Sequence, residues 1–250
     1  MRYVKPIVRI LLSVTLIVML VLAFVYMPKQ RCERISSVVH TQNESVTVSP
    51  EDVNALIANA GIEVIGKAVK EVDEGEIITL LKANPYIENV NFVHFAGRKL
   101  VIDYTLREIV LHVFTPGGEH YFVDNEGVVV PFTSKMQDYL MIVNGNVGDT
   151  YKVGKKAPKG VQNALELTKV IRGDAFYEAQ FRQIYLNNAN DIELTSTIGG
   201  QTILFGSVEN AAEKLANLKT VYEKGLSHKG YNTYAQLDAR YKNRIIATRK

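Results

Sequence analysis

The sequence predicts an α+β protein: an N-terminal transmembrane helix, a small α+β domain, and a mostly antiparallel β domain with flanking helices. Three observations predict this class. A long uncharged apolar run lies near the N-terminus, two capped helix patterns and a hairpin pattern follow it, and short alternating strands separated by turn residues fill most of the remainder. The boundaries that these patterns predict are a tail over residues 1–9, the membrane helix over 10–27, and two domains over 28–107 and 108–250.

The formal net charge of +3 arises at the N-terminal flank. The chain has 29 basic and 26 acidic residues, and Arg2, Lys5 and Arg9 precede the apolar run with no acid among them. Without these three, 26 basic residues face 26 acidic ones, so the remainder is formally neutral. Because a neutral surface lacks the positive charge that phosphate backbones attract, the composition argues against a nucleic-acid partner.

Cys32 is the only cysteine, so no disulfide can form within the chain. The residues before it, Lys29-Gln30-Arg31, differ from the small apolar residues of a lipid-attachment signal. We therefore interpret Cys32 as an unpaired and poorly ordered thiol beside the membrane.

Ile10 to Met27 contains no charged residue and is rich in Leu, Val and Ile. At about 1.5 Å per residue, a helix of this length nearly spans a hydrocarbon core of about 30 Å. A cleaved signal peptide is the alternative, but the run ends without an A-x-A-like cleavage site. The purely basic flank before the run favours a cytoplasmic N-terminus with the rest of the chain outside the membrane, although basic residues also follow the run.

The first domain combines one strand, two helices and a hairpin. A strand is predicted from Ile35 to Thr47, and Ser49-Pro50 followed by two acids predicts a capped helix that ends at Gly61. The remaining predicted elements are a second helix, Asp73 to Ala83, and a hairpin of Ile87 to Phe95 and Lys99 to Leu106.

The second domain reads mainly as strands. The predicted strands cover Ile109 to Phe114, Glu119 to Val123, Val128 to Val130, Gln183 to Asn187, Asp191 to Ser196 and Gln201 to Phe205. One helix is predicted from Gly160 to Arg172, and another is predicted to be capped by Ser207 and stopped by Gly225.

The C-terminal residues show the clearest strand pattern of the chain. Apolar and polar residues alternate from Ala235 to Lys242, a period of two. Lys242-Asn243 reads as a tight turn, and Arg244 to Thr248 as a last strand at the edge of the sheet.

The residues that usually carry chemistry do not assemble into a known catalytic or metal-binding motif. The five histidines include no H-x-x-x-H or H-E-x-x-H pair, and no serine lies in G-x-S-x-G. Asp124 and Glu126 resemble the paired carboxylates of a glycan hydrolase, but they lie in a tight turn where acidic residues bond the backbone. We therefore expect no enzyme, no metal, no cofactor and no small-molecule substrate.

Four stretches resemble the FtsQ/DivIB family of bacterial cell-division proteins, and their order behind the apolar run strengthens the match. They are Asn84 to Val90, Leu100 to Tyr104 with Arg107-Glu108, Tyr121 to Val129 with its D-x-x-G turn, and Leu237 to Tyr241 followed by Asn243. The chain departs from the family at Gln236, where some members have an aromatic residue, and at Arg107-Glu108, where Glu-Arg is commoner.

The resemblance implies a short cytoplasmic tail, one helix in the bacterial inner membrane, a POTRA domain and a C-terminal β domain outside the membrane. It also implies a non-enzymatic scaffold that binds other single-pass division proteins of the FtsB and FtsL types. A last strand offers a free edge to which a partner can add its own strand. We expect the partner-binding residues to be Leu237, Asp238, Arg240, Tyr241, Arg244, Ile245, Ile246 and Thr248.

On this interpretation, proline at Ile246 abolishes partner binding and leaves the fold intact. The alternative for these residues is that they only complete the sheet. Two other functions also fit part of the sequence. They are a different POTRA-bearing membrane protein of secretion or chaperoning, and an anchored cell-wall hydrolase that uses Asp124.

Overall fold

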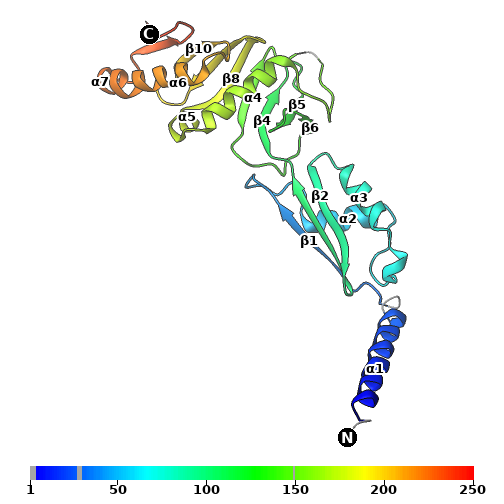
Figure 1. Ribbon diagram of the computed structural model, residues 1–250. Coiled ribbons are helices and arrows are strands. Elements are labelled where there is room, and N and C mark those ends of the chain that lie inside the picture. Colours follow the sequence, from blue (N-terminus) through cyan, green and yellow to red (C-terminus); the bar gives the residue numbers. More distant parts are fainter. Residues whose placement is uncertain (1–3, 27–29, 149) are drawn as a thin grey trace. The chain divides into compact units, whose positions relative to one another are not determined.

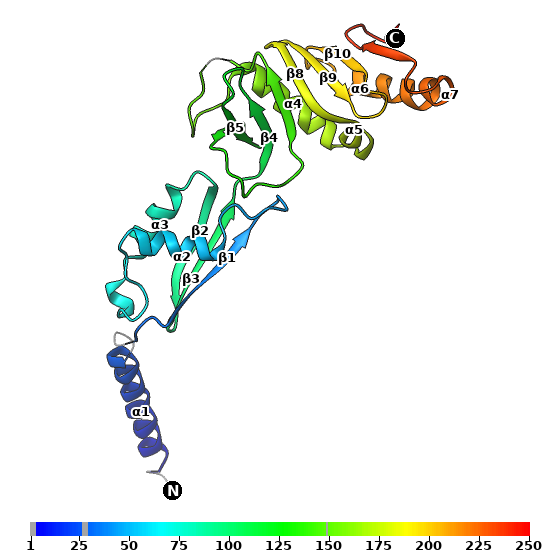
Figure 2. The same cartoon turned by 180° about the vertical axis from the view of Figure 1, so that it is seen from behind.

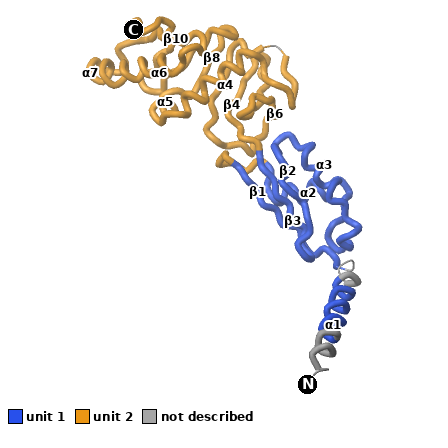
Figure 3. The backbone as a smooth tube through the Cα atoms, in the orientation of Figure 1, with its two compact units in different colours: residues 1–41, 48–106 blue, residues 42–47, 107–250 orange. Residues whose placement is uncertain are grey.

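The computed structural model describes residues 4–26, 30–148 and 150–250. The chain forms two compact units (Figures 1 and 3). Unit 1 comprises residues 1–41 and 48–106, and unit 2 comprises residues 42–47 and 107–250. The short segment 42–47 therefore belongs to unit 2, although the residues on both sides of it belong to unit 1.

The predicted apolar helix forms as α1, from Val4 to Tyr26. Its large apolar side chains between Leu11 and Leu22 are exposed. In the part of the chain that the structure describes, no helix is both long and apolar enough to cross a membrane. The prediction of a spanning helix is not confirmed. Tail residues 1–3 and Met27 lie outside the described residues.

Unit 1 contains a three-stranded sheet with two main helices. The strand order is β1-β3-β2, in which β1 is parallel to β3 and β2 is antiparallel to it. The elements are β1 (Arg34–His40), α2 (Pro50–Asn59), η2 (Val69–Glu71), α3 (Glu74–Lys82), β2 (Ile87–Ala96) and β3 (Lys99–Leu106). The predicted helices and hairpin are confirmed.

Side-chain caps explain where both helices begin. Ser49 and Asp52 form a capping box at α2, in which each side chain accepts a hydrogen bond from the other residue's backbone amide. Asp73 accepts from the amides of Gly75 and Glu76 at the start of α3. Each cap of this kind stabilises its helix by about 1 kcal/mol.

The core of unit 1 includes Tyr104 and Cys32. Tyr104 is fully buried on β3, and its hydroxyl donates to the carbonyl of Val48 at 2.9 Å. Cys32 is buried rather than poorly ordered, because residues 30–32 pair with 66–69: its amide donates to Lys67 and its carbonyl accepts from Gly66. The expectation of a poorly ordered thiol is therefore wrong.

The predicted first strand ends earlier than its pattern suggests, because segment 42–47 bonds within unit 2. The Asn43 side chain donates to the carbonyl of Ile109 at 3.0 Å and accepts from its amide at 2.8 Å. The amides of Glu44 and Ser45 both donate to the Asp138 carboxylate. These bonds satisfy the segment's backbone away from the β1 ladder.

Unit 2 is built on a nine-stranded sheet of order β12-β11-β10-β9-β8-β7-β4-β5-β6. Five of its eight pairings are antiparallel, and β4–β7, β7–β8 and β10–β11 are parallel. The mostly antiparallel β domain is thus confirmed. The strands are β4 (Ile109–Phe114), β5 (His120–Asp124), β6 (Val129–Val130), β7 (Met141–Gly145), β8 (Phe181–Asn188), β9 (Asp191–Ser196), β10 (Thr202–Gly206), β11 (Tyr234–Asp238) and β12 (Ile246–Arg249).

The helices of unit 2 gather on one face of this sheet (Figures 1 and 2). They are α4 (Lys159–Arg172), α5 (Ala175–Gln180), α6 (Ala211–Thr220), η3 (Val221–Leu226) and α7 (Ser227–Lys229). Val161, Leu167 and Ile171 of α4 and Leu215 and Leu218 of α6 enter a single core with the strands. Burial of each such side chain stabilises the unit by about 1.5–3 kcal/mol.

Two boundaries in unit 2 differ from the sequence prediction. The residue that precedes α6 is Asn210, in a left-handed conformation with φ of 55°, rather than Ser207. Helical turns continue past Gly225 as η3 and α7 to Gly230, whose φ is 90°. A left-handed residue ends the helix there, and Gly225 itself has no such conformation.

Candidate partner-binding edge

The two outer strands of the nine-stranded sheet are covered differently. At β6, the Val129 amide donates to Lys155 and the Val129 carbonyl accepts from Gly154, both at 2.8 Å. The neighbouring Ala157 amide donates to Gly127 at 2.9 Å. At β12, by contrast, no described residue pairs with the outer side, and all four residues of the strand are exposed. The free edge of this sheet is therefore β12.

Two hydrogen bonds reveal which amides of β12 face outward. The Lys250 amide donates to Thr233, on the β11 side, and amides of alternate residues in a strand point the same way. Directly after β11, the Ala239 amide donates to Leu204 of β10, so the backbone groups of the preceding residue, Asp238, face β12, opposite Ile246. From both observations, the backbone amides of Ile246 and Thr248 point toward β11, and the amides of Ala247 and Arg249 point toward the free edge.

The direction of the Ile246 amide corrects the expected effect of proline at this position. Because the Ile246 amide faces β11, proline there removes a bond that holds β12 to the sheet. The residues of β12 whose amides are available to an added strand are Ala247 and Arg249.

An ion pair lies where β11 ends and the turn toward β12 begins. We call β11, this turn and β12 the terminal hairpin. Arg240 donates from Nε to Asp238 Oδ1 at 2.9 Å and from Nη2 to Oδ2 at 2.6 Å, and its backbone amide also donates to Oδ1 at 3.1 Å. These hydrogen bonds hold the pKa of Asp238 below its ordinary value and raise the pKa of Arg240. The local bonds turn the chain after Asp238, so the strand stops short of the predicted Lys242.

The turn of the hairpin presents an aromatic ring and a cation. Asn243 has φ of 59°, the left-handed conformation that the predicted tight turn requires. Arg244 lies over the Tyr241 ring, with its guanidinium carbon 4.9 Å from the ring centroid. Tyr241 is 42% exposed, so this pair is open to solvent on the hairpin.

The eight residues predicted to bind a partner differ in how far they are buried. Leu237 is fully buried and Ile245 packs against the same core, so these two hold the hairpin to the sheet. Asp238 is half-buried. The exposed members are Arg240, Tyr241, Arg244, Ile246 and Thr248. The eight predicted residues lie on β11, on β12 and in the turn between them, and Ala247, whose amide faces outward, was not among them.

A buried polar network lies behind β11. The Tyr222 hydroxyl donates to Ser196 at 2.8 Å and to Gln201 at 3.1 Å, and Gln180 donates to Ser196 at 2.5 Å. Gln201 in turn donates to the carbonyl of Tyr231, in the segment that leads into β11. Burial raises the pKa of Tyr222, which keeps its hydroxyl a donor. The network ties the start of β11 to β9 and β10, and no sequence motif indicated it.

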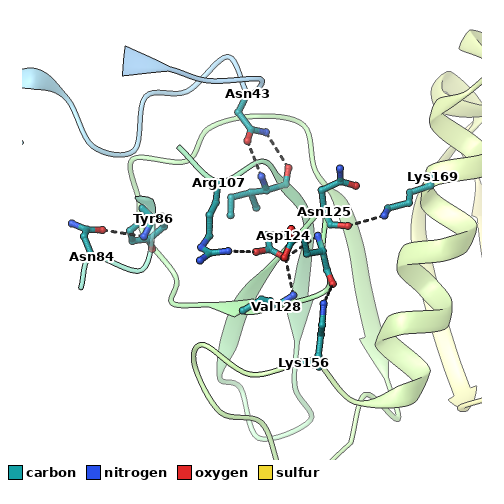
Figure 4. A network of polar contacts seen from close by, with 11 residues as sticks. Asn43, Asn84, Tyr86, Arg107, Asp124, Asn125, Val128, Lys156 and Lys169 are labelled. Carbon is teal, nitrogen blue, oxygen red and sulfur yellow. Dashed lines mark hydrogen bonds and ion pairs between the residues drawn. The ribbon is translucent and has the colours of Figure 1, made fainter. Parts of the chain in front are cut away.

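Asp124 acts as a structural hub, as Figure 4 shows. It is 2% exposed, accepts from Arg107 at 2.7 Å, and its other oxygen accepts from the amides of Glu126 and Val128. Lys156 and Lys169 donate to the turn carbonyls of Glu126 and Asn125. Both carboxylate oxygens are thus engaged, which explains the D-x-x-G pattern as a turn requirement.

Two histidines lie against each other on the face of the sheet opposite α4. His112 Nε2 is 3.0 Å from His120 Nδ1, and both rings stack against Phe132. Burial, with His120 as a second cause, lowers the pKa of His112 to about 4. No group of three or more His, Cys, Asp or Glu side chains that could hold a metal ion occurs in the described part of the chain.

These features define a class of protein: a POTRA-like domain followed by a β domain whose last strand is a free edge. A POTRA-like domain family matches residues 30–105, and the family described as FtsQ/DivIB, C-terminal related, matches residues 109–248. The chain belongs to this FtsQ/DivIB-related family, a group of non-enzymatic cell-division proteins, and the resemblance found in the sequence is confirmed. A comparison with curated proteins gave no match.

Proposed function

We propose that the protein is a non-enzymatic scaffold of the bacterial division machinery that binds single-pass division proteins of the FtsB and FtsL types. One observation carries the proposal: β12 is a free edge, whereas β6 at the other end of the sheet is covered by residues 154–157. Exposed edges invite strand addition, and folded proteins usually protect them. An edge left free in a scaffold family therefore supports docking by β-strand addition.

The proposal includes an anchor in the bacterial inner membrane. The run from Ile10 to Met27 lacks charges, and members of the FtsQ/DivIB family are membrane-anchored. The basic residues before the run support a cytoplasmic N-terminus, with residues 28–107 and 108–250 acting as two domains outside the membrane. Expression of fusions that report cytoplasmic or external placement of residue 250 tests this orientation, and a cytoplasmic signal would reverse it.

Depletion of the protein followed by microscopy tests the cellular role. A division scaffold predicts filamentous cells with blocked septa. Cells of normal length that accumulate unfolded envelope proteins would instead favour a POTRA-bearing protein of secretion or chaperoning.

A second experiment tests the docking edge with purified components. Full-length protein in detergent is mixed with a purified FtsB-type partner, and binding is measured for the wild type, Ala247→Pro and Ala247→Val. Proline should abolish binding because it removes an outward amide, while valine keeps the amide and suits a strand. Equal binding of all three chains would exclude docking at β12. Far-ultraviolet circular dichroism of each variant checks that the fold is kept.

A further inference from the structure

The residues at the free edge carry positive charge and no negative charge. Between Tyr241 and Lys250 the chain has four cations, Lys242, Arg244, Arg249 and Lys250, and no acid. None of the four forms a salt bridge within the described residues, whereas the nearby Arg240 is paired with Asp238. The hairpin therefore presents uncompensated positive charge beside a strand edge that is open.

These cations lie at the two ends of the edge rather than along it. Arg244 is held near the turn by the Tyr241 ring, and Arg249 is the last residue of β12. The four residues between them, 245–248, are uncharged. At about 3.4 Å per residue, the two guanidinium-bearing positions are roughly 17 Å apart along the strand.

We propose that β12 docks an extended acidic segment, in which about four uncharged residues separate two carboxylates. This inference rests on the proposed function and specifies the chemistry of the partner. The outward amides of Ala247 and Arg249 would pair with the backbone of the added strand, and each end carboxylate would face one arginine. Opposite charges at paired strand positions stabilise a sheet, and like charges oppose it.

The same charges disfavour a second copy of this chain as the occupant. Antiparallel self-pairing of β12 sets Arg249 of one strand beside Arg244 of the other, so cations meet at both ends. Like-charge pairs across strands are destabilising, and basic residues are a common device against edge-to-edge association. An acidic partner converts this repulsion into attraction.

Two peptides of identical composition test the spacing. The first, Gly-Ser-Glu-Val-Thr-Val-Thr-Glu-Ser-Gly, places its carboxylates at the proposed separation, and the second, Gly-Glu-Glu-Val-Thr-Val-Thr-Ser-Ser-Gly, places both at one end. Binding to the full-length protein in a non-ionic detergent is measured at low salt. The first peptide should bind about fivefold more tightly, since each exposed ion pair contributes modestly.

Charge exchange tests the pairing itself. Arg249→Glu should weaken the first peptide about threefold or more, and a peptide with Lys in place of one Glu should regain the affinity for that variant. Lys229→Glu, an exposed cation outside the hairpin, is the matched control and should change little.

The outcomes separate this inference from the proposed function. If Ala247→Pro leaves peptide binding unchanged, the acidic peptide does not dock at β12 and this inference falls, while the proposed function still depends on the experiment with the partner. If Ala247→Pro abolishes binding while both peptides bind wild type equally, the edge stands and the acidic spacing is wrong. If the four cations bind vesicles of anionic phospholipid and neither peptide binds, the surface meets lipid headgroups and the inference is overturned.

Discussion

Arg240 holds the Asp238 carboxylate through two side-chain contacts, Nε to Oδ1 at 2.9 Å and Nη2 to Oδ2 at 2.6 Å. Asp238 is the last residue of β11 and Arg240 lies in the segment that leads to β12, so the pair marks where β11 ends. Bidentate pairs of this kind fix direction as well as distance. The position of β12 therefore depends on an interaction between residues only two apart in sequence.

Asp238→Asn should loosen the hairpin with little change in global stability. The asparagine side chain keeps the shape of the carboxylate but loses its charge, and a partly exposed ion pair of this kind contributes about 1 kcal/mol. Hydrogen exchange at the Thr248 amide should accelerate. Asp174→Asn, which removes the partly exposed pair with Lys219, is the control and should leave β12 unaffected. Unchanged exchange in Asp238→Asn would show that the pair does not position the hairpin.

Arg107→Met should destabilise unit 2 by about 3 kcal/mol, because it leaves the buried Asp124 carboxylate without its cation. Urea unfolding followed by circular dichroism measures the change. The double variant Arg107→Met with Asp124→Asn should recover part of the loss, since it removes the unpaired charge. A double variant as unstable as the sum of the two single ones would contradict this explanation.

Tyr222→Phe should cost about 1–3 kcal/mol, because it leaves Ser196 and Gln201 with fewer partners in a buried network. Thermal unfolding of the full-length chain measures it. Tyr185→Phe, at a tyrosine that is 43% exposed, serves as the control and should be neutral. If both variants melt alike, the network does not stabilise the unit.

His112 should make stability depend on pH between about 6.5 and 4. Its pKa falls from 6.5 to about 4 on folding, so the unfolded chain takes up the proton first as the pH is lowered. Its stabilising contribution is fully present above pH 6.5 and is lost as the pH falls to about 4, with a slope below about 1.4 kcal/mol per pH unit. His112→Gln should flatten that part of the curve, and the exposed His94→Gln should not. Parallel curves for the wild type and His112→Gln would refute the assignment.

Local patterns predicted much of the fold. Ser49, Asp73 and the turn at Asn243 were readable because caps and turns depend on residues a few positions apart. The missed strand β7 reads as a short apolar run in a long loop, and only its parallel pairing with β4 and β8 makes it a strand. Segment 42–47 was assigned to a strand because alternation does not show that Asn43 bonds Ile109, many residues away.

The candidate site was predictable in part for the same reason. Alternation placed Leu237 and Ile246 on neighbouring strands, and family resemblance drew attention to that hairpin. The direction of each amide depends on hydrogen bonds to β10 and β11, which are distant in sequence, so Ile246 was chosen where Ala247 faces outward.

Amide hydrogen exchange on β12, measured with and without a purified FtsB-type partner, tests docking at this edge most directly. In the free protein the Ile246 and Thr248 amides should be protected by β11, and those of Ala247 and Arg249 should exchange freely. The partner should slow exchange at Ala247 and Arg249 and leave Ile246 and Thr248 nearly unchanged. Saturating partner that binds the protein without slowing exchange at Ala247 and Arg249 would contradict strand addition at this edge.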